Sequence, residues 1–342
     1  MIKLKKGANF TDIHWGAKNN SDQHNQDCLD YIDWFIKQVI DNDCDHIIFL
    51  GDWFENRSAL NISTMNYSHE GASRLNNLNI PTFFILGNHD LYQKNSRLIY
   101  STIGFTEFSN FQVITEPTII EEITTSPLLC PFIFHHEYEP LMNHPSKFWF
   151  GHFEFNDFVL TGHSVLMKNG ADYTKFNNQK YIFSGHYHKR QKKGNIQYIG
   201  NTFPTNHGDA NDSDRGMMIF DYVTEEPIYI NWEVCPKYIT TSISNILDGQ
   251  ILPNKSRVKC LTDIALNYEE ITKLKQSLTD QFNLRELQFE DIIEEIEAEE
   301  SVIENNSEAV IDHMNDTIVK MLSTISVNGI DPELLIAEFL KL

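Results

Sequence analysis

Short, mostly apolar segments recur along the first 235 residues, and five of them end abruptly at polar residues. The segments are three to five residues long and contain many β-branched and aromatic side chains, which is typical of buried strands. We therefore predict strands at residues 8–11, 46–50, 82–86, 148–150 and 181–184.

Two longer segments with a helical spacing of apolar residues separate the first three strands. Apolar side chains between Leu29 and Ile40 fall on one face of a helix, and a second helical stretch spans about residues 61–79. The order strand, helix, strand predicts parallel strands joined by right-handed crossovers. The carboxyl ends of such strands line one crevice. We therefore expect the polar residues that follow the five strands to converge at one place.

The remainder of the chain predicts two smaller pieces. Residues 238–246, 257–264 and 284–292 have the pattern of strands, and residues 269–282 have that of a helix, which together indicate a small α/β unit. Beyond it, apolar residues repeat at helical spacing between Val310 and Ile325, and Asp331-Pro332 begins a second short helix.

The chain of 342 residues has a formal net charge of -21, and the second part is the more acidic. Residues 1–235 have 18 basic and 28 acidic side chains, whereas residues 236–342 have 9 and 20. Ten acidic residues and no basic one lie between Glu286 and Glu308, so we place an acidic linker at residues 293–307. This balance excludes a simple electrostatic DNA coat, because an acidic surface repels phosphate.

Composition excludes further classes of protein. No run of about 18 apolar residues exists, so no membrane-spanning helix is expected. The amino-terminal residues lack the apolar core of a signal peptide, and we expect a cytoplasmic protein (in the host cytoplasm if a phage encodes it). The five cysteines are odd in number and form no Cys-x-x-Cys pair, which argues against a disulfide framework and against a cysteine zinc site.

Seven potential metal ligands follow the five predicted strands. They are Asp12, His14, Asp52, Asn88, His152, His186 and His188. Seven donors are too many for one tetrahedral ion but suit two ions that share a carboxylate, and nitrogen and oxygen donors without a thiolate favour manganese, iron or zinc. Two such ions about 3.5–4 Å apart bind the attacking and leaving oxygens of a phosphoryl displacement and lower the pKa of a water between them.

The motifs that contain these donors resemble those of a known family. Asp-x-His, Gly-Asp, Gly-Asn-His-Asp, Gly-His and Gly-His-x-His occur in the order found in the calcineurin-like metallophosphoesterase superfamily, over about residues 1–233. Within it, the chain is most similar to the SbcD-type nuclease subunits of double-strand-break-repair complexes, and particularly to their T-even phage form. The stretches that support this are residues 51–57, 151–156 and 214–221.

The resemblance implies an α/β architecture. Residues 1–233 would form a metallophosphoesterase β-sandwich flanked by helices, and residues 234–292 a small α/β capping domain that holds DNA, although a packing appendage is the alternative. Residues 308–342 would form a helix-loop-helix that binds the coiled coil of an SbcC-type ATPase, unless its apolar faces pack on the catalytic domain instead. The family also implies a homodimer through the nuclease domain.

The resemblance assigns a role to each donor. Asp12, His14 and His188 would hold one divalent ion, Asn88, His152 and His186 the other, and Asp52 would bridge them. The ions implied are manganese, with magnesium as the alternative.

Two further residues receive a role from the same resemblance. His89 would lie beside the scissile phosphate and stabilise the transition state or protonate the leaving oxygen. Asp90 would hold the ring of His89. Glu55 departs from the aspartate of the phage form, so we leave it outside the site. His135 and His136 match no motif, and we interpret them as structural or surface residues.

A short basic run follows the last motif. Lys189, Arg190, Lys192 and Lys193 come directly after His188. A solvated turn and a contact with the DNA backbone are both consistent with such a run.

The function that these features favour is a manganese-dependent DNA exonuclease and endonuclease subunit, which hydrolyses phosphodiester bonds with a hydroxide that bridges the metals. The first alternative is another phosphoesterase, such as a protein phosphatase or a cyclic nucleotide phosphodiesterase. The phosphatases of this superfamily have Gly-Asp-x-Val-Asp-Arg-Gly and Gly-Asn-His-Glu, whereas this chain differs over residues 51–57 and has Asp90. The second alternative is a non-catalytic scaffold, against which the presence of all seven donors and His89 argues.

Overall fold

A computed structural model describes residues 3–160 and 166–291 of the chain. The predicted acidic linker and the two predicted carboxyl-terminal helices lie outside these residues. Within the described residues, no helix is long and apolar enough to cross a membrane.

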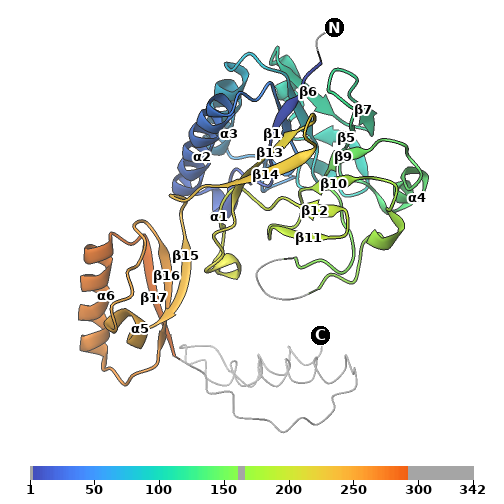
Figure 1. The fold of residues 1–342 in the computed structure, drawn as a ribbon. Helices are drawn as coiled ribbons and strands as arrows, with labels where there is room; N and C mark the ends of the chain where they lie inside the picture. Colours follow the sequence, from blue (N-terminus) through green and yellow to red (C-terminus); the bar gives the residue numbers. More distant parts are fainter. Residues whose placement is uncertain (1–2, 161–165, 292–342) are drawn as a thin grey trace, which may run out of the picture. The chain divides into compact units, whose positions relative to one another are not determined.

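The first sheet has six strands in the order β14-β13-β1-β2-β3-β6 (Figure 1). The central strands β1, β2, β3 and β6 are parallel, and β13 and β14 extend the sheet in antiparallel fashion. Their bounds are Lys6–Phe10 (β1), His46–Phe49 (β2), Thr82–Ile85 (β3), Phe111–Ile114 (β6), Gly216–Asp221 (β13) and Glu226–Asn231 (β14). The sequence prediction of parallel strands is therefore confirmed for the first three.

The second sheet also has six strands, in the order β11-β12-β10-β9-β8-β7. Strands β8, β9, β10 and β12 are parallel, and β7 and β11 are antiparallel to their neighbours. Their bounds are Thr118–Ile119 (β7), Leu128–Cys130 (β8), Phe148–Gly151 (β9), Tyr181–Ser184 (β10), Gln191–Lys193 (β11) and Ile196–Tyr198 (β12). The five predicted ligand-bearing strands thus divide between two sheets, three in the first and two in the second.

Alternation of side chains along the strands packs the two sheets face to face. On β2, Ile47 and Phe49 pack against the helices, whereas Ile48 packs between the sheets. On β9, Phe148 and Phe150 face the first sheet and Trp149 faces outward into a third cluster. Strands β2 and β9 are buried on both faces, because a sheet that is covered on both sides has no polar face in its centre. The result is the predicted β-sandwich flanked by helices.

Helices α2 (Asp22–Asp41) and α3 (Ile62–Asn76) cover the outer face of the first sheet (Figure 1). Both begin at a capping residue: Ser21 accepts a hydrogen bond from the backbone N–H of His24, and Asn61 accepts one from that of Ser63. The shorter elements of this part are α1 (Ala17–Asn20), β4 (Leu91–Gln93), β5 (Ser96–Tyr100), η1 (Ile103–Glu107), η2 (His135–Glu137), α4 (Tyr138–Leu141), η3 (Tyr173–Lys175) and η4 (His207–Asp209).

A separate three-stranded parallel sheet follows, with its own apolar core. It contains β15 (Tyr238–Ser242), α5 (Ile243–Leu247), β16 (Arg257–Thr262), α6 (Tyr268–Phe282) and β17 (Glu286–Asp291). The strand predicted at residues 238–246 ends at Ser242. The Ser242 side chain accepts a hydrogen bond from the N–H of Asn245 and caps helix α5, so the prediction was wrong for residues 243–246. Arg285 of this unit forms a bidentate ion pair with the buried Asp27 of α2, with both N–O distances at 2.6 Å.

Candidate metal centre

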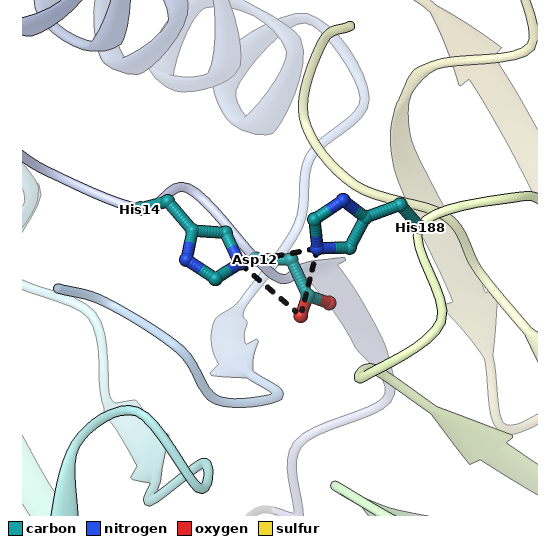
Figure 2. Close-up of side chains that lie close together, drawn as sticks. All are labelled: Asp12, His14 and His188. Atoms are coloured by element: carbon teal, nitrogen blue, oxygen red, sulfur yellow. Dashed lines mark hydrogen bonds and ion pairs between the residues drawn. The ribbon is translucent and has the colours of Figure 1, made fainter. Parts of the chain in front are cut away.

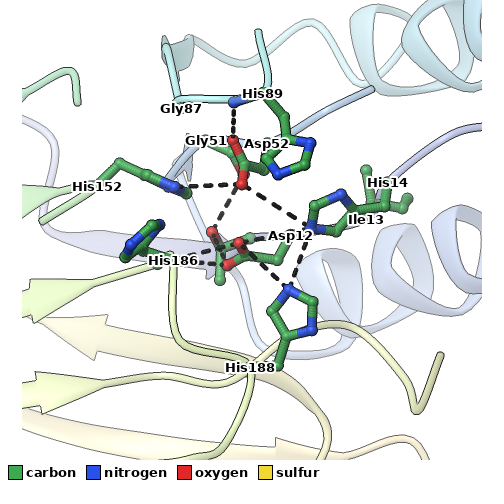
Figure 3. Close-up of polar contacts among 12 residues, drawn as sticks. Asp12, Ile13, His14, Gly51, Asp52, Gly87, His89, His152, His186 and His188 are labelled. Atoms are coloured by element: carbon green, nitrogen blue, oxygen red, sulfur yellow. Dashed lines mark hydrogen bonds and ion pairs between the residues drawn. The ribbon is translucent and has the colours of Figure 1, made fainter. Parts of the chain in front are cut away.

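The polar residues predicted as ligands meet at one edge of the sandwich. The loops after β1, β2 and β3 come from the first sheet, and those after β9 and β10 come from the second (Figure 3). Within each sheet these strands are parallel, so their carboxyl ends lie at the same edge. Packing of the two sheets then joins the two rows of loops into one site.

Asp12, His14 and His188 form the first group of donors, with one ligand atom of each within 4.8 Å of the others (Figure 2). The Nε2 atoms of the two histidines are 3.2 Å apart. They lie 3.8 Å (His14) and 4.0 Å (His188) from Oδ1 of Asp12. These are the spacings expected of atoms that could surround one ion.

Asp52, His152 and His186 form the second group. The side-chain oxygen of Asn88 lies 2.9 Å from a ring nitrogen of each of these two histidines, so it belongs to the same group. Oδ2 of Asp52 is 3.3 Å from Nε2 of His152 and 3.9 Å from Nε2 of His14. Asp52 is therefore the carboxylate that reaches both groups (Figure 3).

The electrostatics of the site fit a bound cation. Asp12 and Asp52 are almost fully buried, and isolated carboxylates are costly to bury. Burial raises the pKa of Asp52, but the neighbouring His152 outweighs this effect and the pKa falls well below its usual range. Burial alone would lower the pKa of His152, yet Asp52 raises it to about 9. The two buried carboxylates thus favour positive charge at this position, which a bound divalent cation would supply.

The site also requires unusual backbone conformations. Asp12, His14, Asp52 and His186 all have positive φ angles, of 53°, 52°, 61° and 88°. Residues other than glycine rarely adopt this region, and such residues concentrate at functional sites. This strain brings the side chains of both sheets inward, and no pattern in the sequence indicates it.

Hydrogen bonds to the main chain orient several of the donors. Nδ1 of His152 donates to the carbonyl oxygen of Leu50 at 2.7 Å, which leaves Nε2 directed at Asp52. The backbone N–H of His186 donates to both carboxylate oxygens of Asp12, at 3.2 and 3.1 Å. The N–H of His89 donates to Oδ1 of Asp52 at 2.8 Å.

The structure gives Asp90 a task other than the expected one. Its carboxylate is buried and accepts hydrogen bonds from the backbone N–H groups of Gly87, Asp52, Trp53 and Phe54. Asp90 thereby ties the ends of β2 and β3 together. Burial, followed by the charge of Asp52, raises the pKa of Asp90 to about 6.

Glu55, which we had expected to lie outside the site, contacts His14 and His89. Its Oε2 lies 2.8 Å from Nδ1 of His14, and its backbone oxygen accepts a hydrogen bond from Nδ1 of His89 at 2.7 Å. The contact with His14 lowers the pKa of Glu55 to about 2. Glu55 therefore holds the His89 ring, as had been expected of Asp90. The acidic side chain three positions after Asp52 was a sequence signal for the contact with His14 alone, because the His89 ring is held by a backbone carbonyl.

The four predicted DNA-binding residues do not gather into one patch. Arg190 is half-buried, donates to the carbonyl of Ile199 and the side chain of Asn231, and packs over a tyrosine ring. Lys192 and Lys193 lie on β11, which leads away from the site, and Lys193 donates to the backbone oxygen of Asp157. Lys189 remains beside the proposed ligand His188.

Comparison with known proteins identifies the family of this chain. Residues 8–190 match the calcineurin-like phosphoesterase family, and the chain belongs to this family. It is 29% identical over 230 residues to exonuclease subunit 1 of Enterobacteria phage T4, a match that covers 66% of this chain and 67% of that protein.

The solved structures that match this chain have low sequence identity to it. A dimetal phosphatase from Danio rerio has a TM-score of 0.41 at 8% identity, with 64% of this chain and 93% of that one covered. The nuclease MPE of Pseudomonas putida has a TM-score of 0.29 at 15% identity, with 65% and 87% covered. The phosphoesterase YfcE of E. coli has a TM-score of 0.33 at 12% identity, with 65% and 96% covered.

Proposed function

We propose that this phosphoesterase is the nuclease subunit of an SbcCD-like DNA repair and recombination complex, and that it hydrolyses phosphodiester bonds in DNA with two divalent metal ions. The observation that carries the proposal is the pair of donor groups that share Asp52. The similarity to a phage exonuclease subunit supports DNA as the substrate.

The donors divide between two ions in this proposal. Asp12, His14 and His188 hold one, Asn88, His152 and His186 hold the other, and Asp52 contacts both. Manganese is the proposed ion and magnesium the alternative, because the donors are oxygen and imidazole nitrogen. When bound, the two ions would supply the positive charge that binds phosphate oxygens and activates a water molecule.

His89 is the proposed catalytic residue. Its Nδ1 is engaged by the Glu55 carbonyl, so Nε2 is the ring atom available to a substrate. From that position it hydrogen-bonds a phosphate oxygen or gives a proton to the leaving oxygen. Asp90 stabilises this arrangement, because its carboxylate accepts hydrogen bonds from the backbone N–H groups of Asp52 and Gly87.

The rest of the chain has proposed roles that follow the resemblance. Residues 1–233 are the nuclease domain, which pairs with a second copy, and residues 234–292 cap it. Residues 293–307 are a linker, and residues 308–342 bind the coiled coil of an SbcC-type ATPase. The similarity to a protein named as a subunit supports a partner, and the apolar spacing between Val310 and Ile325 supports a helical contact. Deletion of residues 308–342 tests this assignment.

Cleavage assays test the central proposal. The purified chain is incubated with labelled single- and double-stranded DNA, and separately with bis(p-nitrophenyl) phosphate, in manganese, magnesium or chelator. We expect metal-dependent DNA cleavage, and Asp52→Ala should lower its rate by at least about 100-fold because the shared carboxylate is lost. Asp30→Ala, on the exposed face of α2, is the matched control.

The other outcomes of this assay are equally informative. Hydrolysis of the small ester without cleavage of DNA would indicate that the natural substrate is another class of phosphate ester. The assay would then be repeated with the ATPase partner present, to test whether DNA cleavage requires it. Absence of turnover with either substrate, despite metal binding, would indicate a non-catalytic scaffold.

A further inference from the structure

A cavity of about 630 Å³ lies beside the second donor group. We call it the flanking pocket; residues that line it include Lys94, Phe132, Phe134, His135, Glu154 and Lys168. The ring centroid of Phe132 is 5.8 Å from that of His186 and 6.2 Å from that of His152, so this residue separates the pocket from the proposed ligands. The volume is within the range of small-molecule binding sites, which is about 300–1,000 Å³.

The topology explains why this pocket adjoins the site. Strands β8, β9 and β10 are parallel and paired in register, with Cys130 opposite Gly151 and Gly151 opposite Ser184. The loop after β8 therefore begins at the same level as His152 and His186. The β4–β5 hairpin, whose turn contains Lys94, follows Asp90 directly. Two walls of the pocket are thus continuations of segments that build the metal centre.

Arg97 holds these two walls together. Its guanidinium donates to the backbone oxygen of Phe132 at 3.0 and 2.7 Å and to the carboxylate of Glu137. Glu137 in turn accepts a hydrogen bond from the N–H of Phe134 at 2.8 Å, and the guanidinium lies 4.3 Å from the Phe134 ring centroid. The charge of Arg97 is therefore compensated inside the protein, and the aromatic wall has a defined position.

The remaining side chains give the pocket its chemistry. Lys94 and Lys168 are exposed, and among the described residues neither forms an ion pair. Glu154 is the acidic residue of the lining. The two lysines line the same cavity as the aromatic side chains of Phe132 and Phe134. Aromatic side chains stack on nucleobases and lysines bind backbone phosphates, which is how proteins bind single-stranded nucleic acid.

We propose that the flanking pocket binds the base and phosphate of the nucleotide next to the scissile phosphate. The inference rests on the proposed nuclease function and specifies how the substrate is positioned at the same site. It assigns a binding role to Lys94, Lys168, Phe134 and His135. Since a base enters this pocket only when it is not paired, the pocket selects single-stranded or unpaired ends.

Abasic substrates test this contact. A set of single-stranded oligonucleotides of one sequence has a single abasic residue at a different position in each member. With the wild-type chain, an abasic residue next to the cleaved bond should lower kcat/KM by about tenfold, the loss expected for one stacked base. In Phe134→Leu the same replacement should change kcat/KM by less than about twofold. Phe134 is chosen because Phe132 packs against the proposed ligands.

The lysines provide an independent variant on an exposed surface. Lys94→Gln with Lys168→Gln should raise KM for single-stranded DNA and reduce the slope of log K against log[salt] by roughly 1. Lys3→Gln with Lys5→Gln removes the same charge at the opposite edge of the sheet, before β1, and should leave the slope as it is.

Failure of this inference is distinguishable from failure of the proposed function. DNA cleavage that no abasic position affects, with equal salt slopes for the two lysine pairs, overturns the flanking pocket alone. A chain that hydrolyses bis(p-nitrophenyl) phosphate but not DNA overturns the proposed function, and this inference with it.

Discussion

Single residues of the metal centre hold conformations that the chain would not adopt by itself. The positive φ angles of Asp12, His14 and Asp52 each cost on the order of 1–3 kcal/mol. Backbone hydrogen bonds between the loops after β1 and β2 compensate part of this cost: the N–H of Asp12 donates to Gly51 and that of His14 donates to Asp52. The strain persists because these two loops support each other.

Glu55 offers a prediction at this scale. Glu55→Gln removes the negative charge beside Nδ1 of His14 but keeps the backbone carbonyl that holds His89. Loss of a carboxylate that orients a ligating histidine typically weakens metal binding by about 10–100-fold. We therefore expect a higher Kd for manganese in calorimetry, while kcat at saturating manganese stays within a few-fold of wild type.

The control for this variant is Glu121→Gln, a change at an exposed position. An unchanged manganese Kd in Glu55→Gln would show that the contact with His14 does not support the metal. A loss of kcat at saturating metal would instead place the Glu55 side chain in the reaction itself.

At the scale of elements, the site depends on how closely the ends of β2 and β3 approach each other. A Cβ atom at Gly87 would lie 2.2 Å from Oδ1 and 2.3 Å from the backbone nitrogen of Asp52. Glycine is therefore required at this position by the close approach of Asp52. The φ angle of Gly87 is not positive, so its own backbone conformation does not require glycine. Gly51 differs in this respect, because its own φ angle of 101° lies in the region that favours glycine.

Gly87→Ala should consequently push the β2 and β3 ends apart. Overpacking of this kind costs about 1–3 kcal/mol of unfolding free energy. We expect lower stability in chemical denaturation together with loss of manganese binding, because the displaced backbone belongs to Asp52. Gly104→Ala is the matched control, since no atom lies within 4 Å of the added methyl group. Equal behaviour of the two variants would contradict this account of the site.

At the scale of the whole molecule, the net charge of -21 works against binding of DNA by this chain alone. The proposed metal ions and the flanking pocket are local exceptions on an acidic chain. We therefore expect much of the DNA affinity to come from the ATPase partner, and the proposed contact with that partner is residues 308–342.

A chain ending at residue 307 tests whether residues 308–342 bind the partner and are dispensable for cleavage. It should retain metal-dependent cleavage of single-stranded DNA but no longer co-purify with the SbcC-type ATPase, because the proposed apolar helices are missing. The full chain, purified beside it, is the control. Co-purification of the shortened chain would mean that the partner binds elsewhere, and loss of cleavage would mean that the helices support the nuclease domain.

The sequence by itself determined most of the elements and the candidate metal donors of this protein. Strand ends, α2, α3 and the small α/β unit follow from local periodicity and capping, and the donors follow from motifs that interrupt the strands. Only the tertiary structure decided how the strands divide between the two sheets, that the backbone carbonyl of Glu55 rather than Asp90 holds His89, and that Arg190 and Lys193 are engaged within the protein. The reason is physical: periodicity reports which face of an element is buried, whereas the partner across a sheet or loop depends on contacts between residues far apart in the chain.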